Sequence, residues 1–137
     1  MKITSREIKS YEINGKNYEF ICESWETYSS WGHEVELFRD SWSRATERRR
    51  YYNRTWEKFR YQSCMLGAIN NAISGVVERV FNEYKYNNNL SRFRKGEKEK
   101  VMADIELNNE EYKELKKLYD YIDNVATGYT IGTVVID

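Results

Sequence analysis

The sequence contains one histidine, two cysteines and no long apolar run. No stretch approaches the ~20 apolar residues that a membrane-spanning helix needs, so we expect no membrane segment. Residues 1–7 lack the apolar core of a signal peptide, which predicts a cytoplasmic protein. Cys22 and Cys64 have no cysteine or histidine beside them at metal-binding spacing. We therefore expect no zinc site and two buried, reduced thiols.

Signatures of catalysis are also scarce. No nucleophile motif surrounds any serine or cysteine, and the seven glycines form neither a phosphate-binding loop nor a dinucleotide fingerprint. The histidine, His33, is expected to be structural or exposed. We predict no cofactor and a protein that acts by binding. The enzymatic alternative is a metal-dependent nuclease, for which several carboxylates would have to converge. The candidates for such a cluster are Glu23, Glu26, Glu34 and Glu36.

Length and composition fit one globular domain. The 137 residues are enough for a single domain, which we place at residues 1–137. Hydrophobic residues make up 40% and charged residues 32% of the chain, which is typical of a soluble globular protein. The chain is rich in aromatics, with 12 tyrosines and 4 tryptophans. These side chains suit a small core or a wet binding surface, because each joins an apolar body to a polar edge.

An antiparallel hairpin is predicted near the N-terminus. Asn14 and Gly15 accept the positive φ angles of a two-residue type I′ turn, and alternating segments flank them. This turn places Tyr11 opposite Tyr18, with glutamates on one face of the hairpin. The opposite face is then formed by Tyr11, Ile13, Tyr18, Phe20 and Cys22.

Two more strands are expected after this hairpin. We interpret residues 25–32 as a turn region and residues 33–38, which alternate, as a third strand. Residues 40–41 make the next turn, and residues 43–52 form an arginine-rich fourth strand. Four consecutive strands with short links favour a β-meander.

A long helix is predicted after the meander, beginning near Thr55. Asn53 or Thr55 can cap it, because either side chain can accept a bond from a free N–H of the first turn. Apolar residues recur at three- and four-residue steps over 56–84, and the asparagines at 87–89 end the helix. Gly67 lowers the helix surface, which would let the helix approach the sheet closely.

The last third is interpreted as a loop, a second helix and a strand. Residues 91–100 are expected to form a loop, whereas residues 101–107 fit either a short strand or a helical turn. Asn108 or Asn109 can cap a second helix. Residues 129–136 are β-branched and predict a final strand. The fold class is therefore α+β, with an N-terminal meander of about four strands packed on a long amphipathic helix, then a second helix and a short strand.

Charge is segregated along the chain although the total is zero. Residues 1–41 hold 5 basic and 8 acidic side chains, a net charge of −3. Residues 42–100 hold 14 and 6, a net charge of +8, and residues 101–137 hold 3 and 8, a net charge of −5. Either the basic middle neutralises the acidic ends within the fold, or part of it meets a phosphate backbone or an acidic protein. The candidate binding residues are Arg44, Arg48, Arg49, Arg50, Arg54, Arg92, Arg94 and Lys95.

Two details bear on these charged surfaces. Alternation along a strand points Arg48 and Arg50 to one face and Arg49 to the other, which weakens a continuous phosphate track. The acids of the predicted second helix could mimic spaced phosphates, but lysines interrupt them, so a solvated helix face is the simpler interpretation. These acids are Glu110, Glu111, Glu114, Asp120 and Asp123.

Residues 51–65 read Tyr-Tyr-Asn-Arg-Thr-Trp-Glu-Lys-Phe-Arg-Tyr-Gln-Ser-Cys-Met. This segment resembles a Tyr-x-Asn-Arg-Thr-Trp-Glu-x-Tyr-x-Tyr-Gln-Ser-like stretch of small accessory proteins from Firmicutes phages and mobile elements. The resemblance covers residues 10–85. It implies an anti-CRISPR-like (type II-A) inhibitor of a host defence nuclease, acting in the bacterial cytoplasm on a partner such as Cas9 with guide RNA. The segment also has a structural interpretation, in which Thr55 caps the helix while Trp56 and Phe59 fasten it to the sheet.

Two further hypotheses stay open. The basic middle could make the protein a nucleic-acid-binding accessory or regulatory protein with direct DNA or RNA contact. The long helix, which carries Gly67, Ser74 and Gly75, could also pack against its symmetry mate in a homodimer.

Overall fold

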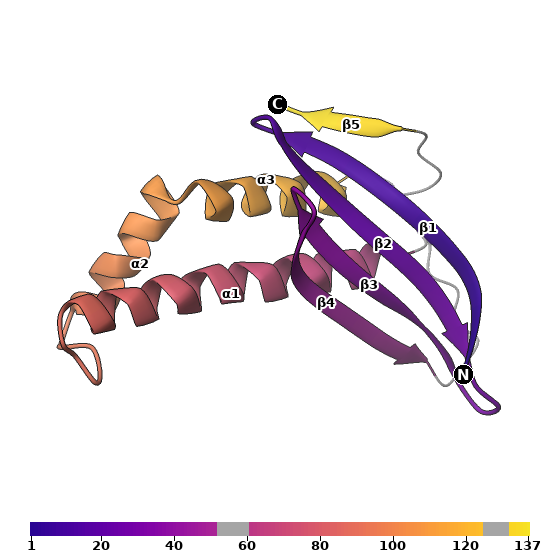
Figure 1. Cartoon of the computed structure of the whole chain (residues 1–137), viewed down its shortest axis with the longest axis horizontal. Coiled ribbons are helices and arrows are strands. Elements are labelled where there is room, and N and C mark those ends of the chain that lie inside the picture. The colour runs from indigo at the N-terminus through magenta and orange to yellow at the C-terminus, as the bar shows by residue number, and fades with distance from the viewer. Residues whose placement is uncertain (52–60, 125–131) are drawn as a thin grey trace.

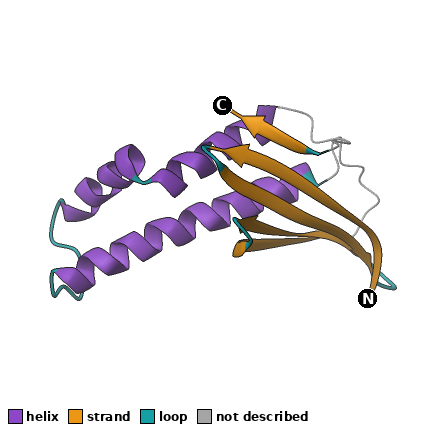
Figure 2. Cartoon of the chain, turned by 45° about the horizontal axis from the view of Figure 1, so that its top comes forward, coloured by secondary structure: helices purple, strands orange, loops and turns teal. Residues whose placement is uncertain are grey.

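The computed structural model describes residues 1–51, 61–124 and 132–137. Five strands form one sheet in the order β4-β3-β2-β1-β5, and the three helices all lie on one side of it (Figures 1 and 2). No helix or strand of the described ranges covers the other side. The expected α+β class, with a four-stranded meander followed by helices and a short C-terminal strand, is confirmed.

The N-terminal hairpin has the predicted turn and register. It consists of β1 (Lys2–Ile13) and β2 (Lys16–Glu26). Asn14 and Gly15 have φ angles of 52° and 76°, as a type I′ turn requires. Tyr11 lies opposite Tyr18, and Ile13 lies opposite Lys16. The predicted apolar face is buried and forms the floor of the core.

The third and fourth strands are β3 (Trp31–Arg39) and β4 (Trp42–Tyr51). The turn predicted over residues 25–32 is wrong, because Trp25 pairs with Gly32 as part of the β2–β3 ladder. The turn is confined to residues 27–30, where the backbone N–H of Thr27 donates to the carbonyl of Ser30 at 2.7 Å. Serine and glycine suggested a longer turn, but Gly32 lies within the sheet, where its missing side chain leaves room for the Trp25 ring.

Helix α1 (Gln62–Asn87) begins later than expected. Tyr61, directly before it, has a φ of 69°, a left-handed conformation that separates the helix from the residues before it. The predicted start near Thr55 is therefore wrong. Asn53, Thr55, Trp56 and Phe59, which were expected to cap and fasten the helix, lie outside the described residues.

The apolar stripe of α1 packs on the sheet as predicted. Its buried members lie against the inner faces of β3 and β4 and against α3. Gly67 is buried, and a Cβ atom there would meet the side chain of Glu47 on β4, so this glycine allows the expected close approach. The buried residues of the helix are Cys64, Met65, Gly67, Ala68, Ile69, Ala72 and Val76.

Two helices follow, where the sequence predicted a loop over residues 91–100, either a short strand or a helical turn over residues 101–107, and then one helix. Helix α2 (Glu97–Asn108) includes the last four residues of the predicted loop, and α3 (Glu110–Asn124) follows it. Only Val101 and Ile105 of α2 are buried, so its amphipathic pattern is weak. Asn109 caps α3 as predicted, because its Oδ1 accepts a 2.8 Å bond from the N–H of Tyr112.

The final strand, β5 (Thr133–Ile136), pairs in parallel with β1 at one edge of the sheet. Helix α1 extends well beyond the strands, so the connection from α1 to α2 lies at the far end of the molecule (Figure 1). Among the described residues, no helix is long and apolar enough to cross a membrane.

Candidate binding surfaces

The side of the sheet opposite the helices carries a mixed set of acidic, basic and apolar residues, which we call the uncovered face. Buried Tyr18, Phe20 and Cys22 point to the helices, so the residues between them point away. The strand registers extend this face across β1 to β4. Its members are Arg6, Ile8, Glu12, Glu19, Ile21, Glu23, Trp25, Glu34, Glu36, Phe38, Thr46, Arg48 and Arg50.

Glutamates dominate the middle of the uncovered face. We call Glu12, Glu19, Glu23, Glu34 and Glu36 the acidic patch. Glu23 on β2 and Glu34 on β3 lie directly opposite each other, in a row that begins with Arg6 and ends with Arg48. Glu36 accepts a 2.7 Å bond from the hydroxyl of Ser43. The sheet therefore holds carboxylates side by side on its solvent face.

Three members of the acidic patch, Glu23, Glu34 and Glu36, are candidates together with Glu26 for a nuclease metal site. Within the described ranges, no group of three or more Asp, Glu, His or Cys side chains is placed to hold a metal ion. Glu26, one of the four candidates, follows Trp25 on β2 and so points to the opposite face of the sheet.

Part of the basic middle is neutralised inside the fold. Arg44 Nε lies 3.1 Å from Glu111 Oε1, and Arg79 Nη2 lies 3.2 Å from Glu111 Oε2. Arg39, which precedes the basic middle in the chain, is neutralised in the same way, since its Nε lies 3.0 Å from Oε1 of the buried Glu114. The charges of these arginines are therefore neutralised within the fold, and the candidate binding residue Arg44 is paired with Glu111 of α3.

The run from Arg48 to Arg50 divides between two faces, as alternation predicted. Arg49 points to the helix side, where its Nη2 lies 3.8 Å from Glu47 Oε2. Arg48 and Arg50 lie on the uncovered face, where their guanidinium carbons sit 4.5 Å and 5.2 Å from the ring centroid of Trp25. These distances are typical of cation–π contacts.

The other candidate binding residues lie elsewhere. Arg54 lies outside the described residues. Arg92, Arg94 and Lys95 lie in the connection between α1 and α2, residues 88–96, which we call the basic loop. Arg94 Nε is 3.5 Å from Glu97 Oε1, whereas Arg92 and Lys95 are exposed. Figure 1 shows that the basic loop lies at the end of α1 that is far from β4, so the fold does not gather these residues into one site.

The acidic residues of α3 do not form a continuous row on its surface. Glu111 and Glu114 are turned inward, with exposed fractions of 8% and 1%, and they hold Arg44 and Arg39. Glu110, Asp120 and Asp123 are exposed. Glu111 and Glu114 are therefore buried and cannot belong to a surface row of acids that mimics spaced phosphates.

Histidine and cysteine side chains are structural. His33 is buried, with its ring centroid 4.6 Å from that of Tyr61. The thiol of Cys64 donates to the carbonyl of Glu47 at 3.2 Å. Burial raises the pKa of the Cys22 thiol to about 12. Both cysteines are buried and free, as predicted.

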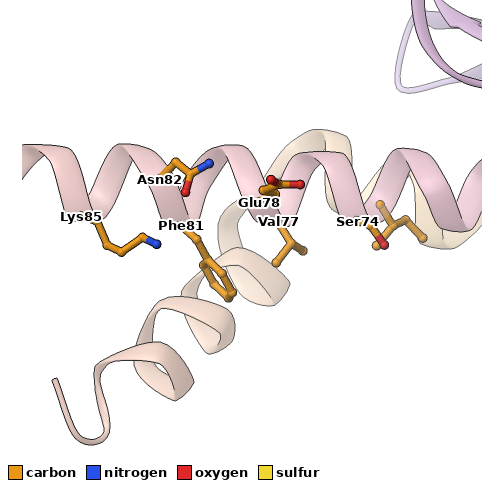
Figure 3. A pocket seen from close by; sticks show the side chains of 7 residues that line it. Ser74, Val77, Glu78, Phe81, Asn82 and Lys85 are labelled. Atoms are coloured by element: carbon orange, nitrogen blue, oxygen red, sulfur yellow. The ribbon is translucent and has the colours of Figure 1, made fainter. Parts of the chain in front are cut away.

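A shallow groove runs along α1 beyond the sheet (Figure 3). Its volume is about 430 Å³ and all its lining residues belong to α1. Three positions of α1, Gly67, Ser74 and Gly75, were expected to support a homodimer. Gly67 packs against β4 and is therefore not available to a second copy. Ser74 and Gly75 are exposed, and Gly75 has no neighbouring atom within 4 Å of a Cβ position. The residues that line the groove are Ile73, Ser74, Val77, Glu78, Phe81, Asn82 and Lys85.

The sequence interpretation missed two residues of potential importance for binding. Trp25 was assigned to a turn, although the alternation of Glu19, Ile21 and Glu23 continues through it and marks it as a strand residue of the uncovered face. Tyr28 is fully exposed at the tip of the β2–β3 turn, and no sequence signal distinguishes it. Comparison of the chain with protein-family models, curated proteins and solved structures found no match.

Proposed function

We propose that this protein is a non-catalytic inhibitor that binds a host defence nuclease complex through the acidic patch on its uncovered face. The observation that carries the proposal is the pair formed by Glu23 and Glu34, which lie directly opposite each other on neighbouring strands. Like charges at opposed positions of a sheet are destabilising by roughly 0.2–1 kcal/mol. A basic partner surface would turn that repulsion into attraction.

The spacing of the patch suits such a partner. Side chains two residues apart on a strand are about 7 Å apart, and neighbouring strands are about 4.8 Å apart. The sheet therefore presents carboxylates in two dimensions on a rigid support. Surfaces that bind nucleic acids are lined with Lys and Arg, which neutralise phosphates. An acidic sheet face can occupy such a surface and exclude the nucleic acid that belongs there.

The resemblance of residues 51–65 to phage and mobile-element proteins supports the choice of partner. It points to a Cas9-type effector with guide RNA, in the cytoplasm of the bacterial host. The patch provides a chemical reason for such an interaction, because a Cas9-type channel for the guide–target duplex is positively charged. A rigid charged surface is sufficient for this function and requires no bound cofactor.

The experiment is co-purification of the tagged protein with candidate defence nucleases, each tested with and without its guide RNA. We expect a complex that weakens as salt concentration rises, because exposed charges are screened. If the acidic patch occupies the nucleic-acid channel, an excess of target DNA should compete with the protein. Failure to bind any defence complex of the host would remove the proposal.

A second candidate function is nucleic-acid binding through the basic loop. The observation in its favour is the exposure of Arg92 and Lys95 at the far end of the helices, close in sequence to Lys98 and Lys100. Affinity for DNA or RNA should then fall steeply with salt concentration. Replacing both Arg92 and Lys95 by glutamine should abolish the affinity for nucleic acid. The double variant that carries both Glu23→Gln and Glu34→Gln should keep this affinity unchanged.

A further inference from the structure

One end of the uncovered face carries a tryptophan that lies across a glycine. Trp25 belongs to β2 and pairs with Gly32 of β3. A Cβ atom on Gly32 would come within 2.5 Å of the Trp25 ring atom Cζ2. Because glycine has no side chain, the indole can occupy the space above β3 and reach toward β4. It is 1% exposed although it lies on the side of the sheet without helices.

Two arginines of β4 cover this indole. Arg50 lies opposite Gly32, and Arg48 lies opposite Glu34. Both guanidinium groups lie within cation–π distance of the ring of Trp25, so one aromatic ring contacts two positive charges. Each cation–π contact is favourable, whereas the two cations repel each other. An anion placed between them would relieve the repulsion.

Among the residues that the structure describes, the donors at this position have no strong acceptor. Arg48 Nη2 contacts the Sδ atom of Met1 at 2.9 Å, and a thioether is a weak acceptor. Neither Arg48 nor Arg50 forms an ion pair with any carboxylate of the described residues. The indole Nε1 of Trp25 is buried and has no hydrogen-bond partner in that same part of the chain. A buried donor without a partner is costly, which makes this position unusual.

We propose that Arg48, Arg50 and Trp25 form an oxyanion site that binds a single phosphate group. Each guanidinium presents a planar fork of donors that matches phosphate oxygens. Phosphate has enough oxygens to accept from both forks at once, while the Trp25 ring fixes their position.

The neighbouring acids set the size of the ligand. Glu34 lies beside Arg48 in the sheet, and Glu23 lies beyond it. These carboxylates repel a second phosphate, so a nucleic acid cannot continue across the face. A single phosphate at the edge of the sheet is compatible with them. The site does not depend on the function proposed for the acidic patch, since its residues are different.

The test follows the indole N–H signal of Trp25 by NMR, assigned with Trp25→Phe, while ligand is added at low salt. One titration uses inorganic phosphate and another uses a short single-stranded oligonucleotide, which separates a free phosphate from a phosphodiester. We expect saturable shifts with at least one of them. The affinity for the oligonucleotide should fall only slowly as salt concentration rises, with the slope expected when about one or two phosphates are neutralised.

Variants identify the site. Arg48→Gln and Arg50→Gln should each weaken binding at least about tenfold, because each removes a charged donor. Arg50→Lys keeps the positive charge, so its affinity should lie between the affinities of the two glutamine variants and that of the wild type. Lys117→Gln, at an exposed position of α3 outside every proposed site, is the matched control and should bind as the wild type does. Absence of saturation with both ligands, or equal binding by the Arg50→Gln and wild-type proteins, would overturn the proposal.

Discussion

Tyr18 Oη donates a 2.7 Å hydrogen bond to Glu114 Oε1, which joins β2 to α3 across 96 positions of the chain. Arg39 Nε donates to the same carboxylate oxygen at 3.0 Å and to the Tyr18 hydroxyl at 3.0 Å. Glu114 is almost fully buried, so these donors replace the water that its charge would otherwise bind. Polar bonds therefore help fix the last helix to the sheet.

Removal of the shared acceptor should be strongly destabilising. In Glu114→Ala the Tyr18 hydroxyl and the Arg39 guanidinium lose their common partner inside the fold. We expect a loss of about 3 kcal/mol in the free energy of unfolding, measured by urea denaturation. Lys116→Ala, at an exposed position of the same helix, should change it by less than about 0.5 kcal/mol. Equal losses in the two variants would contradict this role for Glu114.

Stability should decline at alkaline pH. Burial and the bond to Glu114 raise the pKa of Tyr18 above the ordinary value for tyrosine, and burial raises the pKa of Tyr11 to about 12. In the unfolded chain both phenols ionise near pH ~10. Because the folded state holds these protons more tightly, their contribution is complete below that pH and is lost as the pH rises toward the folded-state values.

The measurement is urea denaturation across the alkaline range. We expect the free energy of unfolding of the wild type to begin to fall near pH ~9, through Cys22, and to fall more steeply above pH ~10, through the two tyrosines. Tyr18→Phe should show a shallower fall, because it has one group fewer to ionise on unfolding. An identical slope in both proteins would show that Tyr18 does not contribute.

The buried thiols should resist modification. Because burial raises the pKa of Cys22 to about 12, very little thiolate exists at neutral or mildly alkaline pH. Cys64 is buried as well. We expect a disulfide reagent at pH ~8 to label neither cysteine in the folded protein and both in denaturant, as counted by mass spectrometry. Rapid labelling of the folded protein would contradict the burial of these side chains.

The two glycines at positions 32 and 75 should respond in opposite ways to alanine. A Cβ atom at Gly32 meets the Arg49 carbonyl and the Trp25 ring, so Gly32→Ala should destabilise the sheet and displace the indole. Gly75 lies in an open position of α1, where alanine should stabilise by roughly 0.5–1 kcal/mol through its helix propensity. Thermal denaturation of the two variants provides the comparison. Stabilisation by Gly32→Ala would contradict the described contact.

The sequence predicted the elements whose signals are local. The Asn14–Gly15 turn determines the register of the hairpin, and Asn109 caps α3, because both effects act within a few residues. For helix α2 the sequence predicted only a helical turn at residues 101–107, as an alternative to a strand, since the helix buries only Val101 and Ile105 and its first turn is polar. The position of β5 beside β1 is a long-range pairing that has no local signal.

The candidate site was harder to predict from the sequence, because its contacts join residues that are far apart in the chain. Alternation correctly separated Arg49 from Arg48 and Arg50, because the side-chain period of a strand is local. The sequence could not show which arginines pair with acids of α3, since Arg44 and Glu111 are far apart in the chain. It also left Trp25 in a turn, because the serines and glycine after it suggested an early end to the strand.

Glu23 and Glu34 are the residues that we propose to contact a defence nuclease. The most direct measurement is target cleavage by a Cas9-type effector that co-purifies with the protein. Three proteins are titrated into this reaction: the wild type, the double variant that carries both Glu23→Gln and Glu34→Gln, and Glu99→Gln as an exposed control on α2. We predict inhibition by the wild type and the control. The double variant should inhibit at least about tenfold more weakly while being as stable or more stable, because the repulsion is removed. Equal inhibition by the double variant, or none by the wild type, would contradict the claim.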